Sequence, residues 1–521
     1  MKPGTPSLDT NADNALYTVA EVRAIEQNAM ASLPPHTLMQ RAGKAAAELA
    51  LALIDTPNAR VLAVAGPGNN GGDAIEAASH LCQTGMDAQV LLMADPASFQ
   101  GDAALSYQRA IACSVPFHAV DSADLLFSQS WNLVLDGLLG IGLARPIDGA
   151  IKAAVESINR LDCPVLALDV PSGLDADTGN VVGQQSGIAV RATHTITFIA
   201  DKPGLHTGMA RDHVGDVTVE RLGIAPALLP PARASRNAVA AFAEWLTPRR
   251  HDSHKGSFGD VTIIGGAHGM TGAPILGARA ALHCGAGRVH VGFVDPGMPA
   301  DSGQPELMCR DAALIDFARG VLVAGPGMGD SRVACDLLAR AVGAALPLLL
   351  DADALNLIAA EDGLRARLTA RRAPTLLTPH PLEAARLLRC SASTVQADRP
   401  AAARELAASL NAIVLLKGSG TVIASPDGQI AINTTGNPAL ATAGTGDVLA
   451  GMTAALMAQH WPAREAALGA AWLHGAAADR LVQQGTGPVG LTASELIPVV
   501  RVLLNEQIAA TAMAIRTSGP R

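Results

Sequence analysis

Short apolar runs alternate with longer helical stretches along the whole chain. Runs that polar positions do not interrupt are typical of parallel strands whose two faces are both covered. In the first half these runs lie at 61–65, 88–93, 133–136 and 164–169, with helical patterns such as 37–53 and 151–160 between them. In the second half they lie at 261–264, 288–292, 321–324, 347–351, 375–377 and 413–416. This repetition of strand and helix predicts an α/β protein with two doubly wound domains.

A proline-rich stretch separates the two halves. It runs from Ala225 to Ala234 and reads APALLPPARA. Proline cannot donate to a strand ladder and biases the residue before it toward extended backbone, so we expect a linker here. The chain has 521 residues, too many for one ordinary core. We therefore predict one domain over residues 1–235 and another over 236–521.

Composition excludes several classes of function. Charged residues make up 16% of the chain, the formal net charge is −9 and aromatics are 3%, so we expect no nucleic-acid partner. We find no apolar run approaching the ~18 residues of a membrane span, and the polar start Met1–Asn14 lacks a signal sequence, so we expect a cytoplasmic protein without a membrane partner. The seven cysteines form no short metal-type pair and are expected to be reduced thiols.

The segment Ala443-Gly-Thr-Gly-Asp447 carries the strongest chemical signal. Its small residues allow a close backbone approach, and Asp447 stands at the start of an apolar segment that is predicted to be helical. Helix N-termini attract phosphate oxygens, and a carboxylate beside a phosphate suggests proton handling. The segment therefore favours phosphoryl transfer to a hydroxyl with Asp447 as the base. The alternative is that Asp447 only caps the helix.

Other strand ends of the second half carry motifs of the same kind. Gly325-Pro-Gly-Met-Gly329, Thr378-Pro-His-Pro-Leu-Glu383 and Lys417-Gly-Ser-Gly-Thr421 each follow a predicted strand, so we expect them to line one crevice. The glycines, hydroxyls and cation of the Lys417–Thr421 turn fit a nucleotide phosphate. For His380 a structural role and a substrate contact are both possible.

The first half carries a glycine-rich strand-to-helix turn, Gly66-Pro-Gly-Asn-Asn-Gly-Gly-Asp73, with the helix expected from Ala74. Backbone amides of such a turn can approach a phosphate, although the spacing is neither G-x-G-x-x-G nor a Walker loop. The alternative is a tight turn with an aspartate cap. Asp136 and Asp169 end later strands, and the hard oxygens of Asn70, Asp136 and Ser172 would suit a hard cation if they converge.

Three of these motifs resemble the YjeF N-terminal domain, the NAD(P)H-hydrate epimerase, over residues 15–225. They are Asn69–Asp73, Gly140-Ile-Gly-Leu-Ala-Arg-Pro146 and Leu168-Asp-Val-Pro-Ser-Gly-Leu-Asp175. The resemblance implies a Rossmann-like domain and a potassium ion held by Asn70, Asp136 and Ser172. Asp169 is our candidate for the group that moves a proton. The resemblance also implies that the hydrated dinucleotide is held by Asn69, Asn70, Gly71, Gly72, Asp73, Gly140, Ile141, Gly142, Leu143, Ala144, Arg145, Pro146 and Asp169.

One departure from the family pattern concerns Ala74, which stands where a glycine is usual. An alanine that had to adopt positive φ would be strained there, whereas an alanine on a helix would be harmless. The structure decides between the two.

The second-half motifs resemble the ADP-dependent NAD(P)H-hydrate dehydratases, which are relatives of ribokinase, over residues 245–505. The resemblance implies that Ala273, Gly327, His380 and Asp447 contact the hydrate, with magnesium and ADP or ATP as cofactors. It implies that the adenine nucleotide is held by Lys417, Gly418, Ser419, Gly420, Thr421 and Gly446. The whole chain thus resembles the fused bifunctional NAD(P)H-hydrate repair enzymes, an isomerase joined to a lyase, and we expect a homo-oligomer.

Rival interpretations remain open at this point. One is a ribokinase-like small-molecule kinase whose N-terminal module binds a dinucleotide without epimerase activity. A kinase would release a stable phosphorylated product, whereas a dehydratase would release free phosphate. An NAD-dependent dehydrogenase is disfavoured, because the G-x-G-x-x-G spacing with a distal acid is missing.

Overall fold

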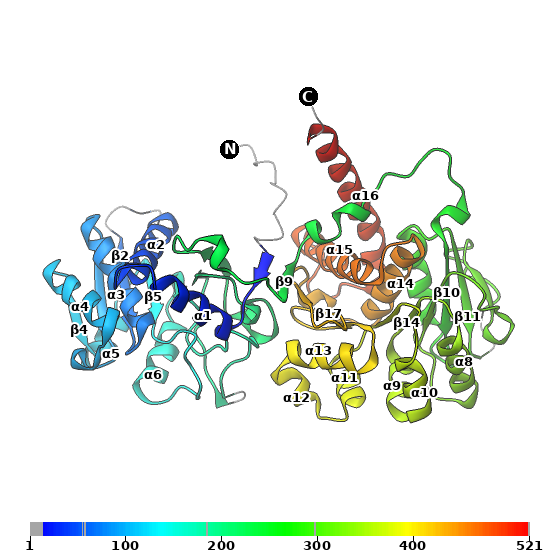
Figure 1. Cartoon of the computed structure of the whole chain (residues 1–521), viewed down its shortest axis with the longest axis horizontal. Helices are drawn as coiled ribbons and strands as arrows, with labels where there is room; N and C mark the ends of the chain where they lie inside the picture. Colours follow the sequence, from blue (N-terminus) through cyan, green and yellow to red (C-terminus); the bar gives the residue numbers. More distant parts are fainter. Residues whose placement is uncertain (1–13, 55, 57–58, 184–185, 296–297, 519–521) are drawn as a thin grey trace. The chain divides into compact units, whose positions relative to one another are not determined.

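The computed structural model describes residues 14–54, 56, 59–183, 186–295 and 298–518, so most of the polar start Met1–Asn14 lies outside the described residues. The chain divides into two compact units (Figure 1). One comprises Ala15–Ala234, and the other comprises the chain from Ser235 onward with Asn14. Each unit is built on its own sheet flanked by helices, which confirms the predicted α/β class with two doubly wound sheets.

The sheet of the first unit is parallel throughout and has the order β4-β3-β2-β5-β6-β7-β8. The chain starts in the middle at β2, runs to one edge and then returns to build the other side from β5. In such sheets the ligand crevice lies at the carboxyl ends of the strands where the order reverses. The strands are β2 (Arg60–Ala65), β3 (Asp87–Leu92), β4 (Phe117–Ala119), β5 (Leu133–Gly137), β6 (Val165–Leu168), β7 (His194–Phe198) and β8 (Asp216–Glu220).

Alternate side chains of these strands enter cores on opposite faces of the sheet. Val61 and Ala63 pack with the helices of one face, and Leu62 and Val64 pack with those of the other. Because both faces are covered, the strands are apolar without alternation. The helices are α1 (Val19–Met30), α2 (Thr37–Leu53), α3 (Asn69–Gln83), α4 (Gly101–Ala112), α5 (Ala123–Phe127) and α6 (Gly149–Ile158).

Helix α3 begins at Asn69, earlier than the predicted start at Ala74. Asn69–Asp73 therefore form the first turn of the helix, where a loop was expected, and the predicted glycine-rich turn is confined to Gly66–Gly68. Glycine weakens a helix by about 1 kcal/mol, but close packing requires it at this position. A Cβ on Gly71 would lie 2.0 Å from the carbonyl oxygen of Gly66, and one on Gly72 would lie 2.7 Å from Sδ of Met39.

Ala74 lies inside α3, is fully buried and is not among the residues with positive φ. The strain that its substitution for glycine could have caused is therefore absent. Its methyl group faces Gly137 at the end of β5, where a second Cβ would lie only 2.4 Å away. The missing side chain of Gly137 makes the room that Ala74 occupies.

The sheet of the second unit has the order β9-β18-β17-β16-β15-β14-β13-β10-β11-β12. Strands β10 to β16 run parallel, and β17 and β18 are antiparallel additions at the side of β16. The order reverses at β10, which pairs with β11 on one side and β13 on the other. The strands are β9 (Ala234–Asn237), β10 (Asp260–Gly265), β11 (Arg288–Phe293), β12 (Met308–Asp311), β13 (Val321–Ala324), β14 (Leu348–Leu350), β15 (Thr375–Leu377), β16 (Ile413–Leu416), β17 (Val422–Ala424) and β18 (Ile430–Asn433).

Helix α14 (Thr445–Ala458) is almost entirely buried and packs against α7 (Gly272–His283). The two backbones meet at Gly451 and Gly277, since a Cβ on Gly451 would lie 1.9 Å from the carbonyl oxygen of Gly277. This contact fixes the N-terminus of α14. The other helices are α8 (Arg332–Gly343), α9 (Ala352–Ala360), α10 (Asp362–Thr369), α11 (Pro381–Leu388), α12 (Ala392–Ala397), α13 (Arg399–Leu410), α15 (Ala463–Gln483) and α16 (Ala493–Ser518).

Helix α16 corrects one expectation from the sequence. Over Ala493–Ala514 it is long and apolar enough to cross a membrane by length and composition, although such a helix is weak evidence of a span. We expected no apolar run of this length because scattered polar residues interrupt the apolar residues of this helix. Leu496, Ile497 and Val500 of this helix are buried in the core of the second unit.

Candidate active sites

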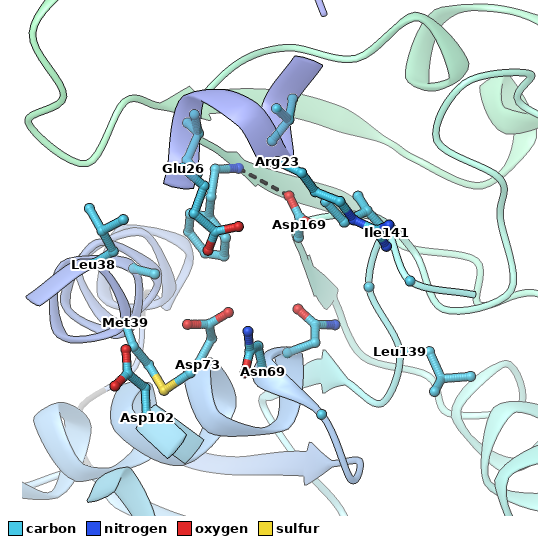
Figure 2. Close-up of a pocket in the computed structure, with 18 of the residues that line it drawn as sticks. Arg23, Glu26, Leu38, Met39, Asn69, Asp73, Asp102, Leu139, Ile141 and Asp169 are labelled. Carbon is cyan, nitrogen blue, oxygen red and sulfur yellow. Dashed lines mark hydrogen bonds between the residues drawn. The ribbon is translucent and has the colours of Figure 1, made fainter. Parts of the chain in front are cut away.

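The first unit contains a cavity of about 840 Å³ at the carboxyl ends of its strands. Its walls come from the start of α3, the loop after β5 and the end of β6, together with α1 and α2 (Figure 2). The cavity lies where the strand order reverses, as the doubly wound topology leads one to expect. Of the predicted epimerase residues, those that line it are Asn69, Asn70, Asp73, Gly140, Ile141, Gly142, Leu143, Ala144, Arg145 and Asp169.

Three predicted residues are not among those that line the cavity. Gly71 and Gly72 face Gly66 and Met39 in the packing of α3 described above. Pro146 lies against Gly183, where a Cβ would come within 2.8 Å of its ring. The structure therefore gives these three residues a packing role.

Asp169 follows β6 and has φ of 64°, a value uncommon for a residue other than glycine. Its Oδ1 accepts hydrogen bonds from Nζ of Lys202 at 2.8 Å and from the backbone N–H of Phe198 at 3.3 Å. Its Oδ2 lies toward Gly140, where a Cβ would be 3.6 Å from it. Asp169 is thus anchored through one oxygen and directs the other toward the loop that lines the cavity.

Lys202, which belongs to no motif recognised in the sequence, is fully buried. Besides Asp169 it donates to Oγ1 of Thr197 at 2.6 Å and to the carbonyl oxygen of Phe198 at 3.1 Å. A buried ammonium needs such partners. Its position just beyond β7 was the signal that could have identified it, but β7 itself was not predicted.

Several acids face this cavity together. Figure 2 shows Asp73 of α3, Glu26 of α1 and Asp169 directed into the same space. Burial, and then the negative charges of Asp169 and Glu26, raise the pKa of Asp73 well above its usual range. Burial and Asp169 also raise the pKa of Glu26. Glu26 lies on α1, far in the sequence from the recognised motifs, so no motif pointed to it.

Asp136, in β5, and Ser172, after β6, contact each other directly. The hydroxyl of Ser172 donates to Oδ1 of Asp136 at 2.6 Å, and its backbone N–H donates to Oδ2 at 2.8 Å. Burial raises the pKa of Asp136 to about 6, against the lowering by these hydrogen bonds. Asn70 is buried nearby in α3, and neither polar atom of its side chain has a hydrogen-bond partner among the described residues. An orphaned buried amide of this kind calls for a ligand or an ion.

In the second unit Lys417, Asp351 and Gly446 come together. Nζ of Lys417, just after β16, donates to Oδ1 of Asp351, just after β14, at 2.8 Å. A Cβ on Gly446 would lie 3.3 Å from the same Nζ and 4.0 Å from Oδ2 of Asp351. The ion pair therefore stands directly at the first turn of α14. Asp351 was not selected from the sequence, although it ends a predicted strand.

Asp447 lies in the first turn of α14 but does not cap it. The N-cap is Gly444, with φ of 90°, and no side chain caps this helix. The cap interpretation is therefore wrong. Burial and the charge of Asp351 raise the pKa of Asp447 to about 6, while Lys417 acts in the opposite direction. A carboxylate poised near neutral pH suits a general base.

Arg399 donates hydrogen bonds to the backbone of the predicted nucleotide turn, Lys417–Thr421, and of the residue before it. This guanidinium is buried and donates to the carbonyl oxygens of Lys417 at 3.1 Å and of Leu416 at 3.2 Å. Gly418 has φ of 143°, and a Cβ there would lie 2.6 Å from a guanidinium nitrogen of Arg399. The turn is thus a rigid feature at the end of β16, next to Gly446.

The predicted hydrate contacts divide into two groups. Gly327 and Ala273 are neighbours, because a Cβ on Gly327 would lie 3.3 Å from that of Ala273. His380 is the N-cap of α11, where its Nδ1 accepts from the backbone N–H of Leu382 at 3.1 Å and of Glu383 at 3.3 Å. The His380 side chain is 47% exposed, so it can contact a ligand while it caps the helix. Among the described residues, no group of three or more histidines, cysteines and acids is placed to hold a metal ion by itself.

Two family models match the chain. Residues 35–204 match the YjeF-related protein N-terminus, and residues 261–500 match NAD(P)H-hydrate dehydratase. Both matches contain the motifs that line the two sites.

Similar proteins span nearly the whole chain. A bifunctional NAD(P)H-hydrate repair enzyme from Coxiella burnetii is 37% identical and covers 94% of this chain and 99% of its own length. One from Escherichia coli is 34% identical and covers 95% of both chains. Among solved structures, the ADP/ATP-dependent NAD(P)H-hydrate dehydratase from Bacillus subtilis, co-crystallised with ATP and Mg²⁺, is 29% identical with a TM-score of 0.45 and covers 51% of this chain and 96% of that chain.

Proposed function

The chain belongs to the family of bifunctional NAD(P)H-hydrate repair enzymes, and on this premise we propose how its residues divide the work. It combines an NAD(P)H-hydrate epimerase with an NAD(P)H-hydrate dehydratase. We assign the epimerase to residues 1–235, a Rossmann-like domain, and the dehydratase to residues 236–521, a ribokinase-like domain. The observation that carries this assignment is that each family match coincides with a site built at the carboxyl edge of its own sheet.

In the epimerase, Asp169 is the group that moves a proton. The hydroxyl of the hydrate is on carbon 6, next to the nitrogen of the nicotinamide ring. Opening at this carbon, assisted by the ring nitrogen, followed by re-closure, inverts its configuration. The carboxylate of Asp169 supports this role because Lys202 anchors Oδ1 and leaves Oδ2 directed toward Gly140. The predicted binding residues that line the cavity, Asn69, Asn70, Asp73 and Gly140–Arg145, hold the dinucleotide. Gly71, Gly72 and Pro146 shape the segments that carry them.

The potassium site predicted from the resemblance is chemically consistent with the residues present. Asp136 supplies a buried carboxylate, Ser172 a hydroxyl, and Asn70 an amide oxygen without a hydrogen-bond partner among the described residues. Hard oxygen donors suit a hard cation. A bound potassium ion would satisfy the amide oxygen of Asn70 and order the start of α3, which lines the cavity.

In the dehydratase, Asp447 takes the proton of the hydrate hydroxyl as this oxygen attacks the terminal phosphoryl group of ADP or ATP. Hydroxide is a poor leaving group and phosphate a good one. Electrons of the ring nitrogen then expel phosphate, and loss of a neighbouring proton restores the dihydronicotinamide. The N-terminal amides of α14, at Gly444–Gly446, face the charge that develops on the phosphoryl group.

The nucleotide is held by Lys417–Thr421 and Gly446, and the hydrate by Ala273, Gly327, His380 and Asp447. Magnesium supplies charge neutralisation on the phosphates when it is bound. Mg²⁺ often enters with the substrate phosphates and keeps several waters, so it needs no protein cage of three acids. The described residues indeed offer no such cage.

We further propose that the protein is a cytoplasmic homo-oligomer without nucleic-acid or membrane partners. The low charged fraction of 16% supports the absence of a nucleic-acid surface. Light scattering on the purified protein measures the oligomeric state directly.

One experiment tests both domains together. A mixture of the two epimers of hydrated NADH is incubated with the protein and ADP, and dihydronicotinamide absorbance is followed. Complete recovery requires both activities, whereas recovery of half requires the dehydratase alone. A stable phosphorylated hydrate in place of free phosphate would instead support the small-molecule kinase, which the relatives do not favour.

A further inference from the structure

The ion pair between Lys417 and Asp351 lies at the place where the proposed chemistry occurs. The ammonium is 2.8 Å from Oδ1 of Asp351 and lies over Gly446, the residue before Asp447. A lysine has a flexible four-carbon stem, so its charge needs a partner to stay in one position. Asp351 is that partner.

The backbone around Asp351 holds this carboxylate in a fixed position. Asp351 is 1% exposed. The backbone of Gly325 approaches so closely that a Cβ there would lie 1.7 Å from the carbonyl oxygen of Asp351. The next residue, Ala352, has φ of 48°, an uncommon conformation for alanine that its surroundings must enforce. The end of β14 is thus shaped to present Asp351 beneath Lys417.

We propose that Asp351 is a positioning residue of the dehydratase, which holds the Lys417 ammonium over the first turn of α14 so that it contacts the phosphoryl group during transfer. This assignment rests on the proposed function of that site. It places Lys417 on the transferred phosphoryl group, together with the amides of Gly444–Gly446, and gives a reason for a buried acid beside a phosphate site. A donor fixed in advance at the developing charge is worth more than one that must be ordered during the reaction.

Asp351 also acts on the base through space. The charged groups that face Asp447 are Asp351, Lys417 and Asp353 of α9. Asp351 and Asp353 raise the pKa of Asp447, and Lys417 lowers it. For Lys417 itself, burial alone would lower the pKa, but Asp351 and Glu383 outweigh burial and keep the ammonium charged. Removing Asp351 should therefore lower the pKa of Asp447, and removing Lys417 should raise it.

The test compares three variants in the dehydratase assay, with the usable epimer, ADP and magnesium. Asp351→Asn should lower kcat by tenfold or more, up to the roughly 10²–10³-fold that the loss of one oxyanion donor costs. It should also move the acidic limb of the pH–rate profile to lower pH. Lys417→Met should lower kcat and move this limb to higher pH. Asp351→Glu keeps the charge but displaces it, so kcat should fall while the limb stays near its wild-type position.

The matched control is Asp260→Asn. Asp260 is also buried and pairs with Arg288 at 2.6 Å. It lies at the start of β10, at the amino-terminal ends of the parallel strands, whereas the candidate site lies at their carboxyl ends. Breaking this pair should leave the acidic limb unchanged. Thermal unfolding of each variant establishes that it is folded.

Several outcomes would overturn the proposal. A folded Asp351→Asn protein with kcat within twofold of wild type and an unmoved limb would remove the role of Asp351. If Asp351→Asn does not fold, an unchanged kcat in Asp351→Glu, or a limb that moves to lower pH in Lys417→Met, would do so. Failure of the proposed function looks different, because Asp447→Asn would then retain turnover whatever Asp351 does.

Discussion

Nζ of Lys202 lies 2.8 Å from Oδ1 of Asp169, and the lysine side chain is fully buried. The pair joins the residue after β6 to the segment after β7, so it both closes this part of the fold and fixes the candidate proton carrier.

Replacing Lys202 with Met should therefore affect stability and epimerisation together. Removing one partner of a buried pair destabilises a protein by about 3–5 kcal/mol, and we expect a value at or below the lower end because Asp169 is 14% exposed on its side chain. Urea unfolding of an isolated 15–234 fragment against the wild-type fragment measures this. In the full chain, recovery from mixed epimers should stop near half while the usable epimer is still consumed. Full recovery at the wild-type rate would contradict the role of the pair.

The pH dependence of the dehydratase should follow Asp447. A base must be deprotonated, so kcat/KM should rise with pH through about pH 6, where the pKa of Asp447 lies in the free protein. Asp447→Asn removes the base and should lower kcat by about 10²–10⁴-fold, with the acidic limb lost. Near-normal turnover in this variant would contradict the proposed mechanism. The epimerase, measured by interconversion of the two epimers without ADP, serves as the internal control.

Epimerase activity should depend on potassium. Replacing potassium by choline at constant ionic strength should lower the rate of epimer interconversion in the wild type. The rate at which the dehydratase consumes the usable epimer does not depend on the first domain's site and should not change through it. Asn70→Ala removes the unpaired amide oxygen and should weaken the apparent potassium affinity. Ser79→Ala, on a later turn of the same helix α3, is the matched control. A rate that is independent of potassium in the wild type would refute the site.

The packing of α7 on α14 predicts a difference between two glycines. Gly451→Ala places a methyl group 1.9 Å from the carbonyl oxygen of Gly277, so α14 must move, and overpacking of this kind destabilises by about 1–3 kcal/mol. Because this helix carries Asp447 at its N-terminus, dehydratase kcat should also fall. Gly363→Ala on α10 meets nothing within 4 Å and should stabilise by about 0.5–1 kcal/mol. Equal melting temperatures for the two variants would contradict this account.

Some features of the two sites could be predicted from the sequence because they are local. Apolar runs identified strands such as β15 and β16, since a strand covered on both faces has to be apolar. The segment at Gly444–Asp447 was recognised because small residues and an acid at a helix start restrict what can bind there. By contrast, β7 and β8 escaped, because β7 mixes threonines with apolar residues and β8 is partly exposed.

The sequence by itself determined the α/β class, the family and the motifs that line both sites. Only the tertiary structure decided that α3 begins at Asn69, that Ala74 packs without strain against Gly137, and that Gly444, not Asp447, is the N-cap of α14. It also brought Lys202 to Asp169 and Asp351 to Lys417. The physical reason is that motifs depend on neighbours in the chain, whereas burial, charge pairing and close backbone approach depend on residues that only the packed sheet brings together.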